Sequence, residues 1–236
     1  MKGLLIPVKD LRNAKQRLAS ALPQSERTAL AEAMFDDFCA SVARIHCVDQ
    51  IFMITSYEPA IERAHALGWE VLRETSQESE SASVDAASRI CAERGIRSLA
   101  RVPIDLPLVA PADIEQIFAA ARPAPSAVIV PSRSGTGTNA LLRTPPALFP
   151  SRFGPNSFPK HSREAEQCGA ELAVLRNEHL ELDVDDWDDL QLLASRSDLP
   201  SATRRWLRSA GLLPSAIAAG ASAYSIRTNL GDAIEE

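Results

Sequence analysis

Carboxylates at two places in this chain of 236 residues could hold a divalent cation. Asp105 lies in residues 101–109, where an apolar run ends between Pro103 and Pro107 shortly before an expected helix. Because proline lacks a backbone donor and restricts the residue before it, these prolines stop the strand and stiffen the backbone around Asp105. Ligands of an open parallel sheet bind beyond the carboxyl ends of its strands, so we expect Asp105 to lie at a binding site.

A second acidic cluster, residues 182–186 (Leu-Asp-Val-Asp-Asp), follows what reads as another strand end. Asp183 or Asp185 could share one cation with the first carboxylate, and a cation with oxygen ligands indicates phosphate chemistry. The cluster also reads as a helix cap, with Asp186 or Asp188 at the start of a helix. Both interpretations can hold together, since different carboxylates would serve the metal and the cap.

Cations follow the first expected strand. Residues 7–18 contain Lys9, Arg12, Lys15 and Arg17, which could neutralise a triphosphate, and arginine can do so through two hydrogen bonds. The segment has no glycine, so it is neither a P-loop nor a dinucleotide fingerprint. A basic loop that only faces water is the alternative.

Two segments of small residues could bind an anion through backbone donors and hydroxyls. Residues 134–139 (Ser-Gly-Thr-Gly-Thr-Asn) include Thr138, and the glycines would let the main chain approach a phosphate closely. A plain hairpin connection is the alternative. Residues 153–158 include Gly154 and Ser157, a turn that leads into a helix with Ser157 as its cap, and a helix N-terminus attracts anions.

Composition limits the class of protein. The chain is 45% hydrophobic and 24% charged, which supports one sizeable core, and its formal charge of −6 without a dense basic patch argues against nucleic acid as a partner. No apolar run approaches the roughly 18 residues of a membrane span, and the chain enters a strand directly rather than through a signal peptide, so we expect no membrane association.

The four cysteines lack metal-ligand spacing, which favours a reducing cytoplasm. We expect the four histidines on the surface, and Trp187 and Trp206 in the core.

The elements that would position these groups follow an alternating pattern. Strands are expected at residues 3–8, 50–56, 69–73, 99–104 and 127–130, and helices at 25–44, 59–68, 83–94 and 111–121. This order predicts an α/β fold with a mostly parallel, twisted sheet and helices on both faces.

After residue 133 the pattern loosens. Short strands at 139–143, 172–176 and 179–182 around a helix at 157–168 predict a small mixed strand insertion, and helices follow at 187–195 and 202–209. From residue 211 onward alanine, serine and glycine dominate without apolar periodicity, so we expect a disordered tail.

Five motifs in this order resemble the phospholactate guanylyltransferase family, nucleotidyltransferases of the nucleotide-diphospho-sugar transferase type that act in assembly of coenzyme F-420. The motifs are Ala-Lys-Gln-Arg-Leu at 14–18 after Pro-Val-Lys, Asp-Leu-Pro-Leu at 105–108, Gly-Thr-Asn-Ala-Leu-Leu at 137–142, Phe-Gly-x-x-Ser-Phe at 153–158 and Leu-Asp-Val-Asp at 182–185. The likeness spans about residues 3–193. It implies a nucleotidyltransferase domain over residues 1–196, followed by a C-terminal helix and tail over 197–236.

The resemblance also implies roles for the residues above. It places Mg²⁺ on the carboxylates of Asp105, Asp183 and Asp185, with Asp105 also counted as catalytic. It places Lys15, as the second catalytic residue, at the phosphates of GTP together with Lys9 and Arg17.

The acceptor of such an enzyme is a small phosphorylated acid, and its phosphate would lie near Thr138, Gly154 and Ser157. Residues 83–87 read Ser-Val-Asp-Ala-Ala where the family shows Gly-Leu-Asn-Ala-Ala. The departure leaves the choice of base or acceptor open and makes Asp85 a candidate substrate-binding residue.

The resemblance therefore predicts a cytoplasmic, GTP-dependent guanylyltransferase that acts on 2-phospholactate, phosphoenolpyruvate or 3-phosphoglycerate and releases pyrophosphate. A cytidylyl or molybdopterin guanylyl transferase is an alternative, although the glycine-rich first loop of those enzymes is missing. A non-catalytic nucleotide-binding subunit is another, and the retention of both acidic sites argues against it. The oligomeric state stays open, with a dimer as one alternative.

Overall fold

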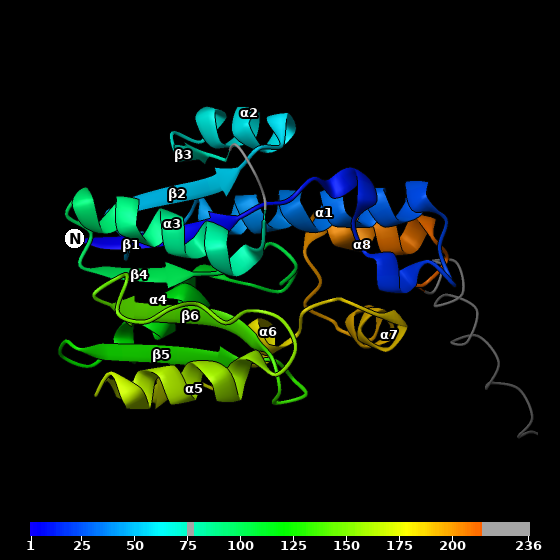
Figure 1. Cartoon of the computed structure of the whole chain (residues 1–236). Coiled ribbons are helices and arrows are strands. Elements are labelled where there is room, and N and C mark those ends of the chain that lie inside the picture. Colours follow the sequence, from blue (N-terminus) through cyan, green and yellow to red (C-terminus); the bar gives the residue numbers. More distant parts are fainter. Residues whose placement is uncertain (75–77, 214–236) are drawn as a thin grey trace, which may run out of the picture.

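The computed structural model describes residues 1–74 and 78–213, which form a seven-stranded sheet with the strand order β3-β2-β1-β4-β6-β5-β7 (Figure 1). The strands are β1 (Lys2–Pro7), β2 (Gln50–Thr55), β3 (Glu70–Arg73), β4 (Ser98–Arg101), β5 (Ser126–Pro131), β6 (Thr138–Thr144) and β7 (Glu171–Val174). β6 runs antiparallel to its neighbours β4 and β5, while the other neighbouring pairs are parallel. The predicted fold class is confirmed, and two of the strands expected in a small insertion, β6 and β7, belong to the main sheet.

Helices cover both faces of this sheet. They are α1 (Gln24–Val42), α2 (Glu58–Ala66), α3 (Glu80–Glu93), α4 (Pro111–Ala119), α5 (Ser157–Gln167), α6 (Glu178–Glu181), α7 (Trp187–Ala194) and α8 (Ser201–Ser209), with short 3-10 turns η1 (Leu11–Asn13) and η2 (Gln16–Leu18). α1, α2 and α4 share one apolar cluster with the sheet, whereas α3 and α5 pack against its other face. None of the helices within the described ranges combines the length and the apolar composition needed to cross a membrane.

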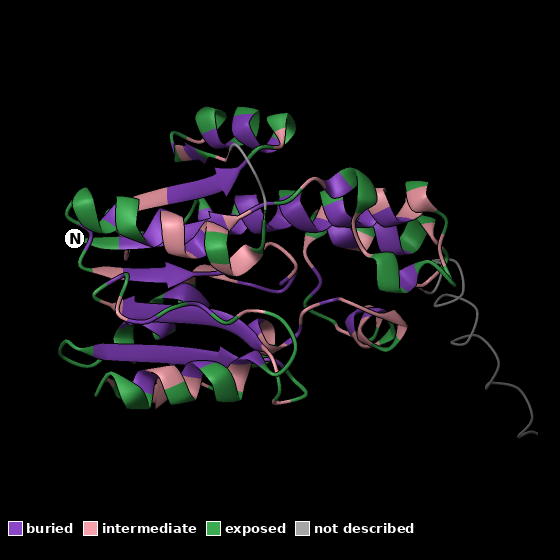
Figure 2. Ribbon diagram, in the orientation of Figure 1, coloured by how far each residue is buried: buried purple, intermediate pink, exposed green. Residues whose placement is uncertain are grey.

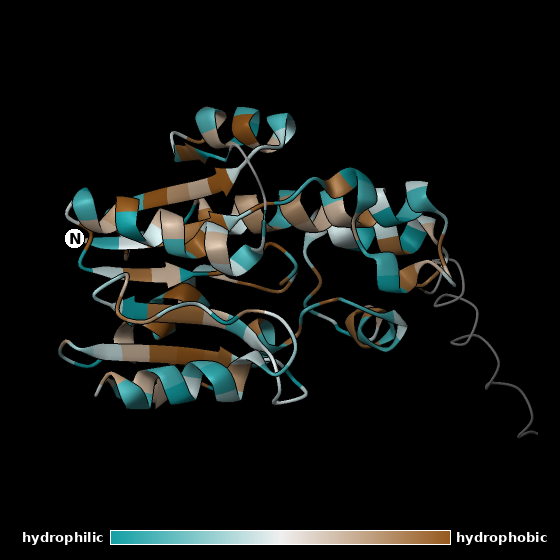
Figure 3. Ribbon diagram, in the orientation of Figure 1, coloured by the Kyte–Doolittle hydropathy of each residue, from teal (hydrophilic) through white to brown (hydrophobic). Residues whose placement is uncertain are grey.

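The core follows the period of the strands. In β1, Leu4 and Ile6 pack into the cluster with α1, while Leu5 packs into the cluster with α3. All three side chains are fully buried, as expected for a central strand that is covered on both faces. The central strands β1, β4, β5 and β6 are accordingly mostly buried in Figure 2, whereas the edge strands β3 and β7 are largely exposed or half-buried. The hydrophilic residues of Figure 3 lie mainly on the outer faces of the helices.

One expected strand, residues 179–182, is a helical turn instead, so that prediction was wrong. The side chain of Asn177 accepts hydrogen bonds from the backbone nitrogens of His179 at 2.9 Å and Leu180 at 3.0 Å. This cap satisfies donors that would otherwise be unpaired at the start of α6. The acidic cluster therefore follows a helical turn and not a strand end.

Residues beyond the carboxyl ends of the strands form a second apolar cluster. Leu30 and Met34 near the middle of α1 pack with Trp206 and Leu207 of α8, and Figure 1 shows α8 beside α1. Asp37 caps α8 by accepting from the backbone nitrogens of residues 202 and 203 at 3.0 and 2.7 Å. Trp206 is in the core as expected, and the partly buried Trp187 packs against the same cluster. The tail predicted to be disordered lies, from residue 214 onward, outside the described residues.

Candidate active site

Two loops bring the acidic residues together beyond the sheet. β4 ends at Arg101, and Asp105 follows in a turn, as expected from the flanking prolines. The backbone nitrogen of Val184 donates to the carbonyl oxygen of Asp105 at 3.2 Å, which joins this turn to the second acidic loop. Asp105, Asp183 and Asp185 all line one cleft of about 600 Å³, which we call the polar cleft.

A second hollow of about 460 Å³, the loop cleft, is lined by the basic segment after β1, including Lys9, Lys15 and Arg17. Asp105 and Asp185 line both clefts. The two clefts therefore adjoin at these carboxylates, with cations on one side and the polar wall on the other.

Lys15 connects the basic segment to both acidic loops. Its backbone is left-handed, with φ 55°, and its side chain is only 9% exposed. The Nζ atom lies 3.4 Å from Asp105 Oδ2 and 3.7 Å from Asp185 Oδ1. Arg17 is more exposed and pairs with Asp185 at 3.5 Å and Asp186 at 2.9 Å. Lys9 lines the loop cleft with an exposed side chain. Because Lys15 and Arg17 pair with the acidic loops, the basic segment does not merely face water.

The carboxylates crowd one another. Burial and the negative charges of Asp105 and Asp185 raise the pKa of Asp183 to about 6. Burial and the charge of Asp105 also raise the pKa of Asp185, against the opposing effect of Lys15 and Arg17. Asn139 of β6 partly compensates by donating to Asp183 Oδ1 at 3.1 Å, and the same nitrogen donates to two carbonyl oxygens of α6.

This donor set fits a magnesium ion that is held partly by substrate. Within the described residues, no group of three or more His, Cys, Asp and Glu side chains is arranged to hold a metal by itself. Mg²⁺ keeps several waters and usually binds through one or two carboxylates plus substrate phosphates. A cation would also relieve the crowding that raises the pKa of Asp183, so the residues are compatible with the ion. The assignment of all three carboxylates remains a prediction.

The neighbouring acids cap a helix, as the second interpretation of this cluster expected. Asp186 is the N-cap of α7 and accepts from the backbone nitrogen of Asp189 at 3.2 Å, while Asp189 accepts from Asp186 N at 3.3 Å. Asp189 also pairs with Arg133 at 3.0 Å. Asp188 is not the cap, although it lies in the first turn.

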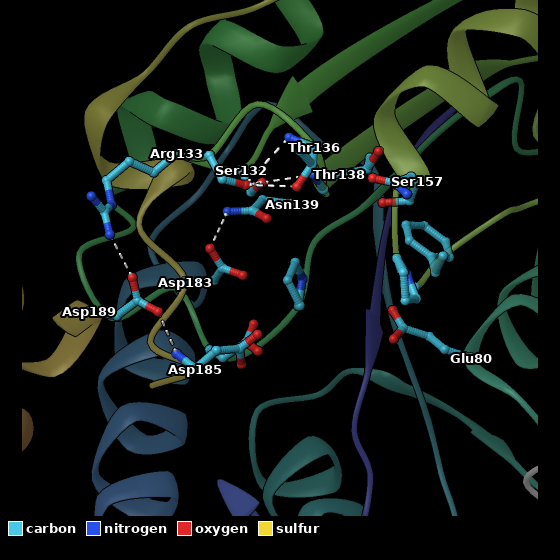
Figure 4. A pocket seen from close by; sticks show the side chains of 18 of the residues that line it. Glu80, Ser132, Arg133, Thr136, Thr138, Asn139, Ser157, Asp183, Asp185 and Asp189 are labelled. Atoms are coloured by element: carbon cyan, nitrogen blue, oxygen red, sulfur yellow. Dashed lines mark hydrogen bonds and ion pairs between the residues drawn. The ribbon is translucent and has the colours of Figure 1, made fainter. Parts of the chain in front are cut away.

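Hydroxyl groups line the opposite wall of the polar cleft, in the turn between β5 and β6. Ser134 Oγ lies 3.0 Å from Ser132 Oγ and 2.8 Å from Thr136 Oγ1, and Gly137 N donates to Ser132 Oγ at 2.9 Å. Thr138 follows as the first residue of β6 and also lines the cleft. Figure 4 shows Ser132, Thr136 and Thr138 together on one side of the pocket. Asp183 and Asp185 lie apart from Ser157 in the same view.

The segment before α5 completes this wall. Gly154 has φ 111°, and Asn156 has φ 55°, so the chain turns sharply before the helix. Ser157 was expected as the cap, but the N-cap is Asn156, without a side-chain hydrogen bond, and Ser157 is the first helical residue. Gly154 and Ser157 both line the polar cleft together with Thr138, so these three predicted residues come together.

The structure does not bring Asp85 to either cleft. Its carboxylate pairs with Arg143 at 3.2 Å and accepts from the backbone nitrogen of Ser151 at 3.0 Å. Asp85 therefore holds the segment that leads to Gly154 rather than facing the cleft. A direct contact between Asp85 and substrate has no support in this geometry.

Three consecutive backbone nitrogens of this segment have side-chain partners. Besides Ser151, Arg152 N donates to His161 Nε2 at 2.7 Å, and Phe153 N donates to Ser81 Oγ at 2.9 Å. His161 is fully buried, so its expected place on the surface was wrong. His161 follows Ser157 by four residues, which puts both on one face of the helix. This spacing was the signal in the sequence that His161 lies near the predicted site.

Arg101 and Glu80 are further residues of the site that the sequence did not predict. They form an ion pair and line both clefts, and Arg101 Nη1 donates to Asn139 O at 2.9 Å. Arg101 also stacks over Phe153, with its guanidinium carbon 4.2 Å from the ring centroid. Burial lowers the pKa of Arg101 to about 10, against the opposing charges of Asp105 and Asp183. The position of Arg101 at the end of a buried strand was the signal in the sequence that could have identified it as a site residue.

Comparison with known proteins gives one family. A family model described as "Guanylyl transferase CofC like" matches residues 2–222. A phosphoenolpyruvate guanylyltransferase from Rubrobacter xylanophilus is 32% identical, covering 85% of this chain and 97% of that protein. A 2-phospho-L-lactate guanylyltransferase from Methanothermobacter thermautotrophicus is 36% identical, covering 79% of this chain and 81% of that protein. A 3-phospho-D-glycerate guanylyltransferase from Colwellia psychrerythraea is 32% identical, covering 81% of this chain and 90% of that protein.

Solved structures share the fold at low sequence identity. A nucleotide-diphospho-sugar transferase assigned as putative in its description, from Desulfovibrio desulfuricans, has a TM-score of 0.74 at 17% identity and covers 89% of this chain and 96% of that one. A nucleotidyl transferase from Methanothermobacter thermautotrophicus has a TM-score of 0.57 at 16% identity and covers 89% and 99%. These likenesses confirm the fold alone.

Proposed function

The chain belongs to the family of CofC-like guanylyl transferases, and we propose that it joins GMP from GTP to a small phosphorylated acid with release of pyrophosphate, in assembly of coenzyme F-420. The observation that carries this proposal is the meeting of two clefts at Asp105 and Asp185. A cationic cleft suits a triphosphate, and a cleft with hydroxyls and a helix N-terminus suits a smaller anion. The cytoplasm is the expected location, in keeping with the free cysteines among the described residues.

In the proposed reaction a phosphate oxygen of the acceptor attacks the α-phosphorus of GTP. The new P–O bond forms as the bond between the α-phosphorus and the β-bridging oxygen breaks, and pyrophosphate leaves with that electron pair. Because the attacking phosphate is already ionised near neutral pH, no general base is needed. Catalysis then depends on positioning and on neutralisation of charge.

Each group of residues has a part in this reaction. Lys15, with Lys9 and Arg17, would meet the phosphates of GTP and stabilise the charge that develops on pyrophosphate. Thr138, Gly154 and Ser157 would hold the phosphate of the acceptor. Asp105, with Asp183 and Asp185, would hold Mg²⁺, which supplies charge neutralisation between the two polyanions when bound.

The acceptor is 2-phospholactate, phosphoenolpyruvate or 3-phosphoglycerate in this proposal. Relatives named for each of these acids are similarly close to this chain, at 36, 32 and 32% identity, so identity does not select one. The three acids share a phosphate and a carboxylate and differ in a hydroxyl, a double bond or the position of the phosphate.

Pyrophosphate release tests the proposal. The protein is incubated with Mg²⁺, GTP and each acid separately, with CTP in place of GTP and omission of acid as controls. Release that requires GTP and one of the acids supports the proposal and identifies the acceptor. Release with CTP alone would favour a cytidylyl transferase, and GTP binding without release would favour a non-catalytic nucleotide-binding subunit.

A further inference from the structure

His161 is a buried titratable residue that the reaction above does not use. It lies on α5 one turn after Ser157 and is fully buried. Its Nε2 atom lies 2.7 Å from the backbone nitrogen of Arg152, and its Nδ1 atom lies 3.0 Å from Thr138 Oγ1. The ring of Phe153 packs edge-on against the imidazole, with centroids 4.9 Å apart. Both ring nitrogens therefore have a partner and the ring cannot turn freely.

These partners determine where the proton of the imidazole lies. A backbone N–H can only donate, so Nε2 must accept from Arg152 and carries no proton. Burial, together with the positive charges of Arg143, Arg101 and Arg152, lowers the pKa of His161 to about 3, with Asp85 opposing. The imidazole is thus neutral near pH 7, and its one proton is on Nδ1. Nδ1 then donates to the Thr138 hydroxyl oxygen.

The donated bond decides what Thr138 can offer to a ligand. Within the described part of the chain, Thr138 Oγ1 makes no side-chain hydrogen bond other than the one with His161. Since this oxygen already accepts, its own proton remains available for another partner. Thr138 lines the polar cleft together with Gly154 and Ser157, so an oxygen of a bound anion is the partner within reach.

We propose that His161 is a positioning residue, which holds the Thr138 hydroxyl as a hydrogen-bond donor toward an anionic oxygen of the acceptor. The inference rests on the proposed function for the identity of that anion, but the position of the imidazole proton does not depend on it. His161 acts through Thr138. Because the Thr138 hydroxyl then donates a hydrogen bond into the polar cleft, it favours anions, whose oxygens accept, over ligands that present a hydrogen-bond donor at this place.

A second role of the same ring has to be separated from this one. By accepting from Arg152 N, His161 also helps to hold the segment that carries Gly154. Two substitutions divide the roles, because a glutamine oxygen reaches the place of Nε2 and an asparagine nitrogen reaches the place of Nδ1. His161→Gln keeps an acceptor for Arg152 N and loses the donor to Thr138. His161→Asn keeps that donor and loses the acceptor.

Steady-state kinetics test the proposal with these variants. His161→Gln is expected to raise the KM for the acceptor about tenfold or more, as for loss of a hydrogen bond to a charged group, with the KM for GTP unchanged. His161→Asn is expected to raise it less. In a Thr138→Val background His161→Gln should have no further effect, because the hydroxyl that it orients is gone. His46→Gln, at an exposed histidine, is the matched control.

Additive effects of His161→Gln and Thr138→Val would overturn the proposal, as would a larger effect of His161→Asn than of His161→Gln. Nitrogen-15 NMR of the wild-type protein reads the proton directly and needs no variant to fold. A proton on Nδ1 is expected at pH 7, and a proton on Nε2 or on both nitrogens would overturn the proposal. If no acid supports turnover while the proton is on Nδ1, the proposed function fails but the positioning of the Thr138 donor stands.

Discussion

Lys15 is the residue on which the charge balance of the site depends. Its ammonium group lies between Asp105 and Asp185 at 3.4 and 3.7 Å. With a side chain that is 9% exposed, it is screened little by solvent. In the proposed reaction the same cation would neutralise the carboxylates before substrate binds and the phosphates of GTP afterwards, when the carboxylates would hold Mg²⁺ instead.

Replacing Lys15 is expected to affect catalysis more than folding. In Lys15→Met the developing charge on pyrophosphate loses a buried cation, so turnover should fall about 100-fold or more. Lys2→Met, at the opposite end of β1, is the matched control. Turnover of the Lys15→Met protein within threefold of wild type would contradict the role of Lys15.

A substitution at Asp105 tests the assignment of the carboxylates as metal ligands. Asp105→Asn keeps the size of the side chain and the backbone carbonyl that accepts from Val184, so the fold should be retained. Losing one ligand of the cation should nevertheless remove nearly all turnover. Circular dichroism checks the fold, and Asp36→Asn on the exposed side of α1 is the control. Near-normal turnover in folded Asp105→Asn would refute the assignment.

Among the elements, the turn between β5 and β6 leaves no room for a side chain at Gly137. A Cβ atom on Gly137 would lie 2.8 Å from Ser132 Oγ and 3.1 Å from Ser132 Cβ. The serine cannot simply move away, because its hydroxyl accepts from Gly137 N. A glycine is thus needed for close approach within this turn, which carries Thr138 into the cleft.

Gly137→Ala is expected to destabilise this turn by about 1–3 kcal/mol, in the range of overpacking, and to raise the KM for the acceptor. In a Ser132→Ala background the closer of the two contacts is absent, so the same substitution should have a smaller effect. Urea unfolding and acceptor kinetics of the four proteins measure both quantities. Equal effects of Gly137→Ala in the two backgrounds would show that the contact with Ser132 Oγ is not the cause.

The elements that the sequence predicted correctly are those with a clear period or a strong terminator. The prolines around Asp105 and the regular apolar spacing of α1 are examples, and both lie where expected. α6 was missed because its four residues are too few to show a helical period, and only the cap by Asn177 defines it. A cap depends on side-chain orientation, which short apolar runs do not reveal.

The sequence predicted those site residues whose side-chain type alone indicates their chemistry, namely the carboxylates and Lys15. The carboxylates and Lys15 do line adjoining clefts. Asp85, Arg101 and His161 were misjudged or missed because their roles depend on neighbours that are distant in sequence. Asp85 meets Arg143, and His161 meets Thr138, only after β6 is inserted between β4 and β5.

On the scale of the whole molecule, α1 packs both with the sheet and with the second apolar cluster around α7 and α8, which we call the lobe. Phe35 and Phe38 of this helix pack with the sheet, while Leu30 and Met34, near its middle, pack with α7 and α8. The acidic loop between α6 and α7 connects these two regions, so the clefts lie where the sheet meets the lobe. Unfolding of one region is expected to disturb the site as well.

The free energy of unfolding should depend on pH through His161. Burial, together with Arg143, Arg101 and Arg152, lowers its pKa to about 3, with Asp85 opposing, whereas the unfolded value is about 6.5. Between these values the unfolded chain binds the extra proton, so the folded state loses stability as pH falls, by about 1.4 kcal/mol per unit. Over pH 7 to 5 this histidine should contribute a loss of about 2 kcal/mol.

Comparison with His161→Gln isolates this contribution. Other titrating groups, including Asp183, are present in both proteins and cancel in the difference between their free energies of unfolding. That difference should become less favourable to the wild-type protein by about 2 kcal/mol from pH 7 to pH 5 in urea unfolding. A difference that does not change with pH would contradict a neutral, buried His161.

The most direct measurement of the central claim is the mass of the product. The protein, Mg²⁺ and GTP are incubated with 2-phospholactate, phosphoenolpyruvate and 3-phosphoglycerate in separate reactions, which are analysed by mass spectrometry and phosphorus-31 NMR. We predict a product in which GMP is joined to one of the acids through a new diphosphate linkage, with pyrophosphate in equal amount. Unchanged GTP with all three acids, or hydrolysis to GMP or GDP without a joined product, would contradict the claim.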